Sequence, residues 1–130
     1  MSLDILILDD ETIVGERLKA SLEKDGHNLQ TFTSSVEALK SLKEKIFDIV
    51  VTDIRMDDIS GIEILEHVRK KSLRTKVIMI TGYATLEVAR ESLTKGAFDF
   101  IAKPFKIKEI RKAIEKAAEA LRAEDRKSVV

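Results

Sequence analysis

The sequence contains no cysteine, which excludes disulfide bonds and thiolate metal sites. It has no excess of either charge, since Lys plus Arg and Asp plus Glu both total 23. Balanced charge provides no general attraction to nucleic acid, so direct nucleic-acid binding is not expected. No apolar run approaches the roughly 20 residues that span a bilayer, and the first residues lack the basic flank and apolar segment of a signal peptide. We therefore expect a cytoplasmic protein without a membrane segment.

What the sequence does contain is typical of a folded domain. The chain has 130 residues, of which 44% are hydrophobic and 35% charged, enough for one domain with a sizeable core. Residues 1–122 are predicted to form this domain. Residues 123–130 are rich in polar side chains and are predicted to be the start of a linker or a tail.

Five short apolar runs alternate along the chain with patterns of amphipathic helices. This alternation predicts an α/β fold, a three-layer (βα)5 doubly wound parallel sheet with the strand order 2-1-3-4-5 of the flavodoxin and CheY type. The run that ends at Asp53 is apolar and β-branched, which is typical of a central strand covered on both faces. The five runs lie at residues 3–8, 29–32, 48–53, 76–80 and 98–102.

Capping residues and glycines predict where the helices begin and end. Ser34 is followed three residues later by Glu37, and Ser60 by Glu63, so each pair predicts a capping box. The last helix is expected to reach about residue 125. Glycine stops are expected at Gly26 and Gly96. The residues expected to face the core are Val14, Leu18 and Leu22, then Val36, Leu39 and Leu42, then Ile64, Leu65 and Val68, and finally Ile107, Ile110, Ile114, Ala117 or Ala118, and Leu121.

Polar residues stand where four of the five strands end. Asp9 and Asp10 follow the first strand, Asp53 closes the third, Thr81 follows the fourth and Lys103 follows the last. The carboxyl ends of parallel strands meet at one edge of the sheet, so these side chains are expected to converge there. Three carboxylates at close range raise one another's pKa unless a cation intervenes. A hard divalent ion with oxygen ligands fits, which favours Mg²⁺, with Mn²⁺ as the alternative.

The same set of groups suits phosphoryl transfer. An aspartate can act as a nucleophile towards phosphorus and form an aspartyl phosphate. The transferred group then requires its oxygens to be neutralised, which Mg²⁺, the Lys103 ammonium and the Thr81 hydroxyl can supply. Gly82 adds no side chain beside the pocket and leaves room for a donor. The sequence therefore predicts phosphoryl transfer to Asp53.

These motifs resemble those of the response-regulator receiver domain, the CheY-like family, over almost the whole chain to about residue 122. The resemblance is carried by Asp9-Asp10, Asp53, Thr81-Gly82, and Lys103-Pro104-Phe105 after the run Gly96 to Phe100. Finer details around these motifs are similar to the NtrC-type subgroup. There the receiver precedes an AAA+ ATPase that activates sigma-54 transcription and a DNA-binding domain, and neither of those is within this chain.

The resemblance implies a role for each matching residue. Asp53 corresponds to the phosphoacceptor, Asp10 to the direct Mg²⁺ ligand and Asp9 to an acidic neighbour that acts through water. The remaining matches are the backbone carbonyl of Arg55 as a metal ligand, Thr81 as the switch hydroxyl, Lys103 as the phosphate-binding lysine, Phe100 as the switch aromatic, and Arg55 and Tyr83 as positions that tune dephosphorylation. The implied partners are a sensor histidine kinase and a second copy of the chain in a homodimer. The domain would be a switch rather than a turnover enzyme for a metabolite.

One position departs from the family pattern and keeps an alternative open. The family usually has proline where this chain has Asp57, and the change is expected to loosen the loop after Asp53. Asp57 and the following Asp58 add two negative charges near the site, which could assist Mg²⁺ or repel the phosphoryl donor. A degenerate receiver that acts without phosphorylation is therefore the alternative. Two other families with a related fold or chemistry fit the sequence less well. A haloacid-dehalogenase phosphatase needs an aspartate where Arg55 stands, and a flavodoxin needs a Ser/Thr/Gly-rich loop where Asp9-Asp10-Glu11 stands.

Overall fold

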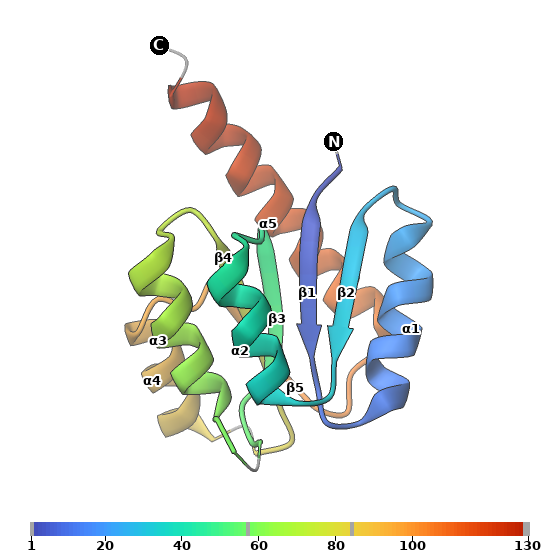
Figure 1. Cartoon of the computed structure of the whole chain (residues 1–130), viewed down its shortest axis with the longest axis vertical. Coiled ribbons are helices and arrows are strands. Elements are labelled where there is room, and N and C mark those ends of the chain that lie inside the picture. The colour runs from blue at the N-terminus through green and yellow to red at the C-terminus, as the bar shows by residue number, and fades with distance from the viewer. Residues whose placement is uncertain (1, 57, 84, 129–130) are drawn as a thin grey trace.

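The structure, a computed structural model, describes residues 2–56, 58–83 and 85–128. It contains one parallel five-stranded sheet in the order β2-β1-β3-β4-β5, which confirms the predicted fold (Figure 1). The strands are β1 (Asp4–Leu8), β2 (Asn28–Phe32), β3 (Ile49–Asp53), β4 (Lys76–Thr81) and β5 (Asp99–Ala102). The helices are α1 (Thr12–Glu23), α2 (Ser35–Glu44), α3 (Gly61–Lys71), α4 (Leu86–Thr94) and α5 (Ile107–Ser128).

Helices cover both faces of the sheet and create two separate cores. One core lies under α1 and α5, and the other under α2, α3 and α4 (Figure 1). Successive residues of β1 alternate between them, because side chains of a strand point to opposite faces. Ile5 and Ile7 belong to the α1–α5 core, and Leu6 and Leu8 to the other. β3 is buried along its whole length, which accounts for its apolar sequence.

The predicted caps form largely as expected. The Ser60 hydroxyl accepts a hydrogen bond from the Glu63 N–H (3.2 Å), and the Glu63 carboxylate accepts one from the Ser60 N–H (2.8 Å), so this capping box is confirmed. The Ser34 hydroxyl accepts the Glu37 N–H (3.3 Å), which is the first half of the other box. The predicted glycine stops both adopt positive φ angles, at Gly26 (86°) and Gly96 (101°).

The predicted inward face of α2 is wrong at Val36, which is 39% exposed. Leu42 is buried and Leu39 half-buried, as predicted. Ser35 and Ala38 are buried with Leu42, at the i, i+3, i+7 spacing of one helical face. Ser35 lies inward because its hydroxyl accepts the N–H of Ile59 (3.0 Å) in the loop after β3. With Ser35 on the inward face, the next residue, Val36, lies outside it, which the apolar pattern alone could not indicate.

The long last helix extends past its expected end. α5 continues to Ser128, beyond the predicted limit near residue 125. Its predicted apolar stripe is buried at Ile110, Ile114, Ala117, Ala118 and Leu121. Among the helices of the described ranges, none has the length and apolarity that a membrane crossing requires.

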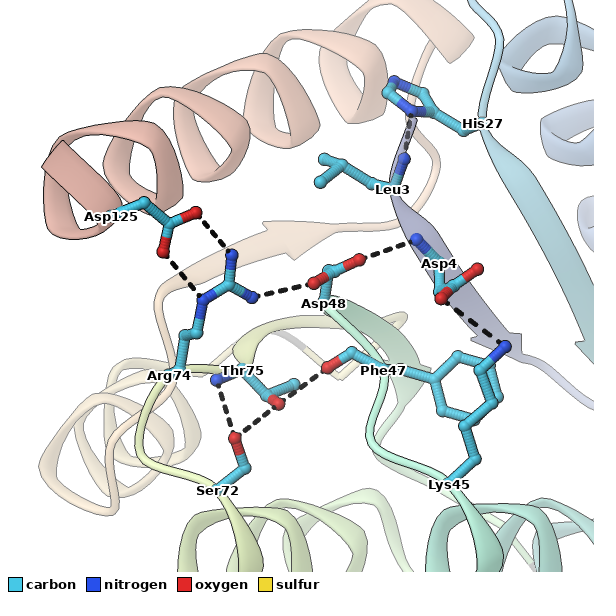
Figure 2. A network of polar contacts seen from close by, with 10 residues as sticks. All are labelled: Leu3, Asp4, His27, Lys45, Phe47, Asp48, Ser72, Arg74, Thr75 and Asp125. Carbon is cyan, nitrogen blue, oxygen red and sulfur yellow. Dashed lines mark hydrogen bonds and ion pairs between the residues drawn. The ribbon is translucent and has the colours of Figure 1, made fainter. Parts of the chain in front are cut away.

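Stability is expected to fall as pH is lowered from 7 to about 5.5, because of His27 and His67. His27 Nδ1 accepts a hydrogen bond from the Leu3 N–H (3.2 Å), a role that requires the neutral ring (Figure 2). Burial lowers the pKa of both histidines, and nearby lysines lower that of His67 further. The unfolded chain therefore binds protons before the folded one does, so stability is present above about pH 6.5 and lost below it.

Urea unfolding at pH 7.0 and 5.5 measures this effect. The double variant His27→Gln, His67→Gln should show a smaller loss of midpoint between the two pH values than the wild type. An equal loss in both proteins would mean that other groups cause the acid sensitivity.

Candidate functional site

Acidic residues meet at the carboxyl edge of the sheet because β1 and β3 are neighbours. Leu8 pairs with Thr52, so Asp9 and Asp10 come directly beside Asp53, the last residue of β3. One carboxylate oxygen of each of these three aspartates lies within 4.8 Å of the others. Asp9 and Asp53 are buried, whereas Asp10 is exposed. The structure thus brings together the three carboxylates that the sequence placed at this edge.

Lys103 reaches this cluster from the end of β5. Its Nζ lies 2.8 Å from Asp9 Oδ2 and 2.9 Å from Asp53 Oδ2. A third carboxylate, that of Glu11, lies 3.0 Å from the same ammonium. No role for Glu11 was predicted, although it directly follows the aspartate pair and its N–H donates to Asp9 Oδ1 (2.8 Å). One ammonium group thus neutralises part of a strongly acidic cluster.

The electrostatics of the cluster follow from this crowding. Burial raises the pKa of Asp9, the contacts with Lys103 and the Glu11 N–H lower it again in part, and the Asp53 charge adds to the rise. Burial lowers the pKa of Lys103, but the three carboxylates outweigh that effect and raise it overall. Lys103 therefore stays protonated at neutral pH. The site retains more negative than positive charge.

The donor set fits a hard divalent cation. All of its ligand atoms are oxygens, which suits Mg²⁺ or Mn²⁺ rather than a soft metal. Asp9 Oδ2 is buried and lies 2.8 Å from the Lys103 ammonium, which already stabilises its charge. A divalent cation among the three carboxylates would reduce the repulsion that a single ammonium leaves between them.

The predicted switch residues occupy different places around the cluster. Thr81, at the end of β4, is fully buried, and its hydroxyl accepts the Tyr83 N–H (3.0 Å). Its carbonyl accepts the Lys103 N–H (2.8 Å), which ties the ends of β4 and β5 together. Phe100 pairs with Met79 in the sheet and is half-buried against the core under α2, α3 and α4. Among the described residues, Phe100 does not line the cleft that opens over Asp53.

A cleft of about 680 Å³ opens over Asp53. The Arg55 N–H donates to Asp53 Oδ1 (3.3 Å), which holds the loop after β3 against the carboxylate. The Arg55 guanidinium lies over the Tyr83 ring, 3.9 Å from its centroid, and this cation–π stack forms one wall of the cleft. The stack joins two loops and was not predicted as a contact. Asp57, the departure from the family pattern, lies outside the described residues.

A second groove, of about 810 Å³, adjoins the first. The two share Glu11, Gly82 and Lys103 in their walls, so a molecule seated in the groove would reach the acidic cluster. The other walls come from the start of α1, where Ile13 is 54% exposed, and from the segment between β5 and α5.

Comparisons with known proteins agree on one family. The family model of the response regulator receiver domain matches residues 5–115. The transcriptional regulatory protein ZraR of Escherichia coli (strain K12) is 33% identical over 116 residues, which are 89% of this chain and 26% of that protein. An NtrX-like response regulator of Rickettsia conorii is 40% identical over 105 residues, 79% of this chain and 22% of that protein. The chain thus spans about a quarter of the length of these relatives.

A solved structure supports the same assignment. The beryllofluoride-activated NtrC4 receiver domain dimer superposes with a TM-score of 0.84 at 32% identity. The match covers 91% of this chain and 98% of that one. The relatives therefore include proteins of the NtrC type, as the sequence motifs indicated.

Proposed function

Because this chain belongs to the response regulator receiver domain family, we propose that it accepts a phosphoryl group from a sensor histidine kinase on Asp53 and then switches conformation. The observation that supports this proposal most directly is the position of Asp53. Its carboxylate is adjacent to two further aspartates and lies 2.9 Å from a lysine ammonium that stays charged. This arrangement provides a nucleophile together with the groups that neutralise an incoming phosphoryl group.

In the proposed reaction an Asp53 oxygen forms a bond to phosphorus while the bond from phosphorus to the donor's nitrogen breaks. The electron pair of that bond leaves with the donor's imidazole. Asp9, Asp10, Asp53 and the Arg55 carbonyl would hold Mg²⁺, which supplies charge neutralisation when bound. Lys103 supplies the remaining positive charge, and the Arg55 N–H orients the carboxylate at Oδ1.

The groove beside the cleft is a suitable place for the kinase to dock. It combines an exposed apolar side chain, Ile13, with the basic Arg17 and Lys106, and it leads directly to Lys103. A donor helix seated there would bring its histidine to Asp53 from the open side of the site.

The proposed switch uses Thr81 and Phe100. The Thr81 hydroxyl accepts the Tyr83 N–H, so its own proton is free to be donated to a phosphoryl oxygen on Asp53. To make this hydrogen bond, the hydroxyl would move towards the phosphoryl group. The movement would leave space behind it, into which the half-buried Phe100 would turn. Such a change biases two pre-existing conformations of the domain.

The output is proposed to be transcription. ZraR is a transcriptional regulatory protein and is about four times as long as the matched segment. By analogy, this receiver would act within a longer protein, in which an AAA+ ATPase and a DNA-binding domain are attached to it. The activated NtrC4 receiver is a dimer, which supports a homodimer for the phosphorylated form of this chain.

The test is the intact mass after incubation with Mg²⁺ and acetyl phosphate, beside the variant Asp53→Asn. A phosphoryl adduct on the wild type and none on the variant is the expected result. If neither gains an adduct while a known receiver does so in the same tube, the degenerate receiver that acts without phosphorylation becomes the better hypothesis.

The Arg55–Tyr83 stack is expected to lengthen the phosphoryl lifetime by covering Asp53. Tyr83→Ala removes the ring and opens that wall of the cleft to water. Loss of a partly exposed cation–π contact should shorten the lifetime about threefold. Tyr83→Phe keeps the ring under the guanidinium and should keep the lifetime of the wild type. The decay of the adduct after removal of acetyl phosphate measures both, and equal decay in Tyr83→Ala and the wild type would rule out a shielding role.

A further inference from the structure

The far end of α5 is attached to the domain differently from the rest of the helix. From Ile110 to Leu121 the helix packs on the sheet through a buried apolar stripe. Beyond Leu121 it projects past the amino-terminal edge of the sheet (Figure 1), and none of the described side chains from Arg122 to Lys127 is buried. Glu124 and Asp125 follow Leu121 at i+3 and i+4, so they lie on the same face of the helix as the apolar stripe. The stripe thus changes from apolar to acidic where the sheet ends.

Basic residues at the start of β4 meet this acidic end. Arg74, just before β4, binds Asp125 with two nitrogens, Nε to Oδ1 at 3.2 Å and Nη2 to Oδ2 at 3.0 Å (Figure 2). Lys76, the first residue of β4, places its Nζ 2.7 Å from Glu124 Oε1. The Lys76 side chain is only 12% exposed, so its position is fixed by packing.

Arg74 is itself fixed to the sheet. Its Nη1 donates to Asp48 Oδ1 (2.7 Å), and the other oxygen of Asp48 accepts the Asp4 N–H (2.8 Å) at the start of β1 (Figure 2). The guanidinium therefore bridges α5 to a carboxylate held at the amino ends of β1 and β3. The hydrogen bonds from Arg74 also lower the pKa of Asp125 below its ordinary value.

We propose that the ion pairs Arg74–Asp125 and Lys76–Glu124 form a polar latch that holds the last two turns of α5, residues 122–128, in line with the packed part of the helix. Ion pairs with exposed acidic partners are individually weak and are screened by salt. The end of α5 can therefore be released while the apolar stripe from Ile110 to Leu121 stays packed. The latch is a conformational device independent of the chemistry at Asp53, which lies at the opposite end of the strands.

Hydrogen exchange of the full chain tests the latch. Asp125→Asn removes the α5 side of the contact and leaves the Arg74–Asp48 pair intact, so the domain should remain folded. The amides of residues 122–128 are expected to exchange about three- to tenfold faster, while those from Ile110 to Leu121 are unchanged. Raising the salt concentration should have the same local effect on the wild type.

Two further variants make the result specific. Glu119→Gln removes the same charge from an exposed position on the same helix, and exchange at residues 122–128 should not change. Arg74→Gln should likewise speed exchange at residues 122–128, because it removes the same contact with Asp125 in addition to that with Asp48. Unchanged exchange at residues 122–128 in both single variants would overturn the latch. Phosphorylation of Asp53 by acetyl phosphate should be the same in Asp125→Asn as in the wild type, so a failure of the latch and a failure of the proposed phosphorylation are separate results.

Discussion

Replacing Lys103 with glutamine is expected to strengthen Mg²⁺ binding and to slow phosphoryl transfer to Asp53. The ammonium lies within 3.0 Å of three carboxylates, two of which would be metal ligands, so it competes with the metal for their charge. Even in a water-like dielectric, two unit charges about 4 Å apart interact by about 1 kcal/mol, so the affinity for Mg²⁺ should rise at least about fivefold. The same ammonium would neutralise the transferred phosphoryl group. Removal of one such group typically slows transfer about 100-fold or more.

Two measurements separate these opposite effects. Calorimetric titration gives the Mg²⁺ affinity without an optical probe, which suits a chain that has no tryptophan. The rate of adduct formation with acetyl phosphate, at Mg²⁺ concentrations that saturate each protein, gives the second effect. Lys106→Gln removes the same charge from an exposed position three residues on and should change neither quantity appreciably. If Lys103→Gln weakens Mg²⁺ binding, Lys103 does not compete for the metal ligands.

The positions of the principal site residues could be predicted because they depend on strand ends. An apolar, β-branched run identifies a buried parallel strand, and the residue after such a run lies at the carboxyl edge of the sheet. Asp9, Asp10, Asp53 and Lys103 are all placed in this way, and the structure brings them together. This prediction requires no knowledge of side-chain conformation beyond the direction in which a strand runs.

Contacts made by long side chains between loops could not be predicted in the same way. Glu11 reaches Lys103 across 92 residues of sequence, and Arg55 stacks on Tyr83 from another loop. Each contact depends on rotamers and on the relative position of two loops, neither of which produces a periodic pattern. The ion pair between Arg74 and Asp125 is a further example. Its acidic partner, Asp125, lies in a polar segment whose sequence resembles a linker. The contact forms only because the helix continues past the sheet, where it meets a residue 51 positions earlier in the sequence.

Gly61 allows α3 to lie close to the backbone of the site, and Gly61→Ala is expected to be among the most destabilising single changes near it. Gly61 begins α3 and donates its N–H to the Ile54 carbonyl (2.8 Å), just after Asp53. A methyl group on Gly61 would overlap the Asp53 carbonyl oxygen and lie 2.7 Å from Ile54 Cα. Both are backbone atoms, so no side-chain rotation relieves the clash. Such overpacking typically costs about 1–3 kcal/mol, and the upper end is expected here.

Gly82→Ala is the matched control, because a methyl group there meets no heavy atom within 4 Å. Its stability should stay within about 0.5 kcal/mol of the wild type, whereas the urea midpoint of Gly61→Ala should fall clearly. The clash can be relieved only if α3 moves away from β3 or the end of β3 shifts, and either movement displaces the backbone that carries Asp53. Gly61→Ala should therefore also form the phosphoryl adduct more slowly under conditions in which it remains folded. A stable Gly61→Ala variant with unchanged phosphorylation would mean that α3 does not need this close contact. The alignment of Asp53 would then depend on the sheet alone, through the register of β3 with β1 and β4.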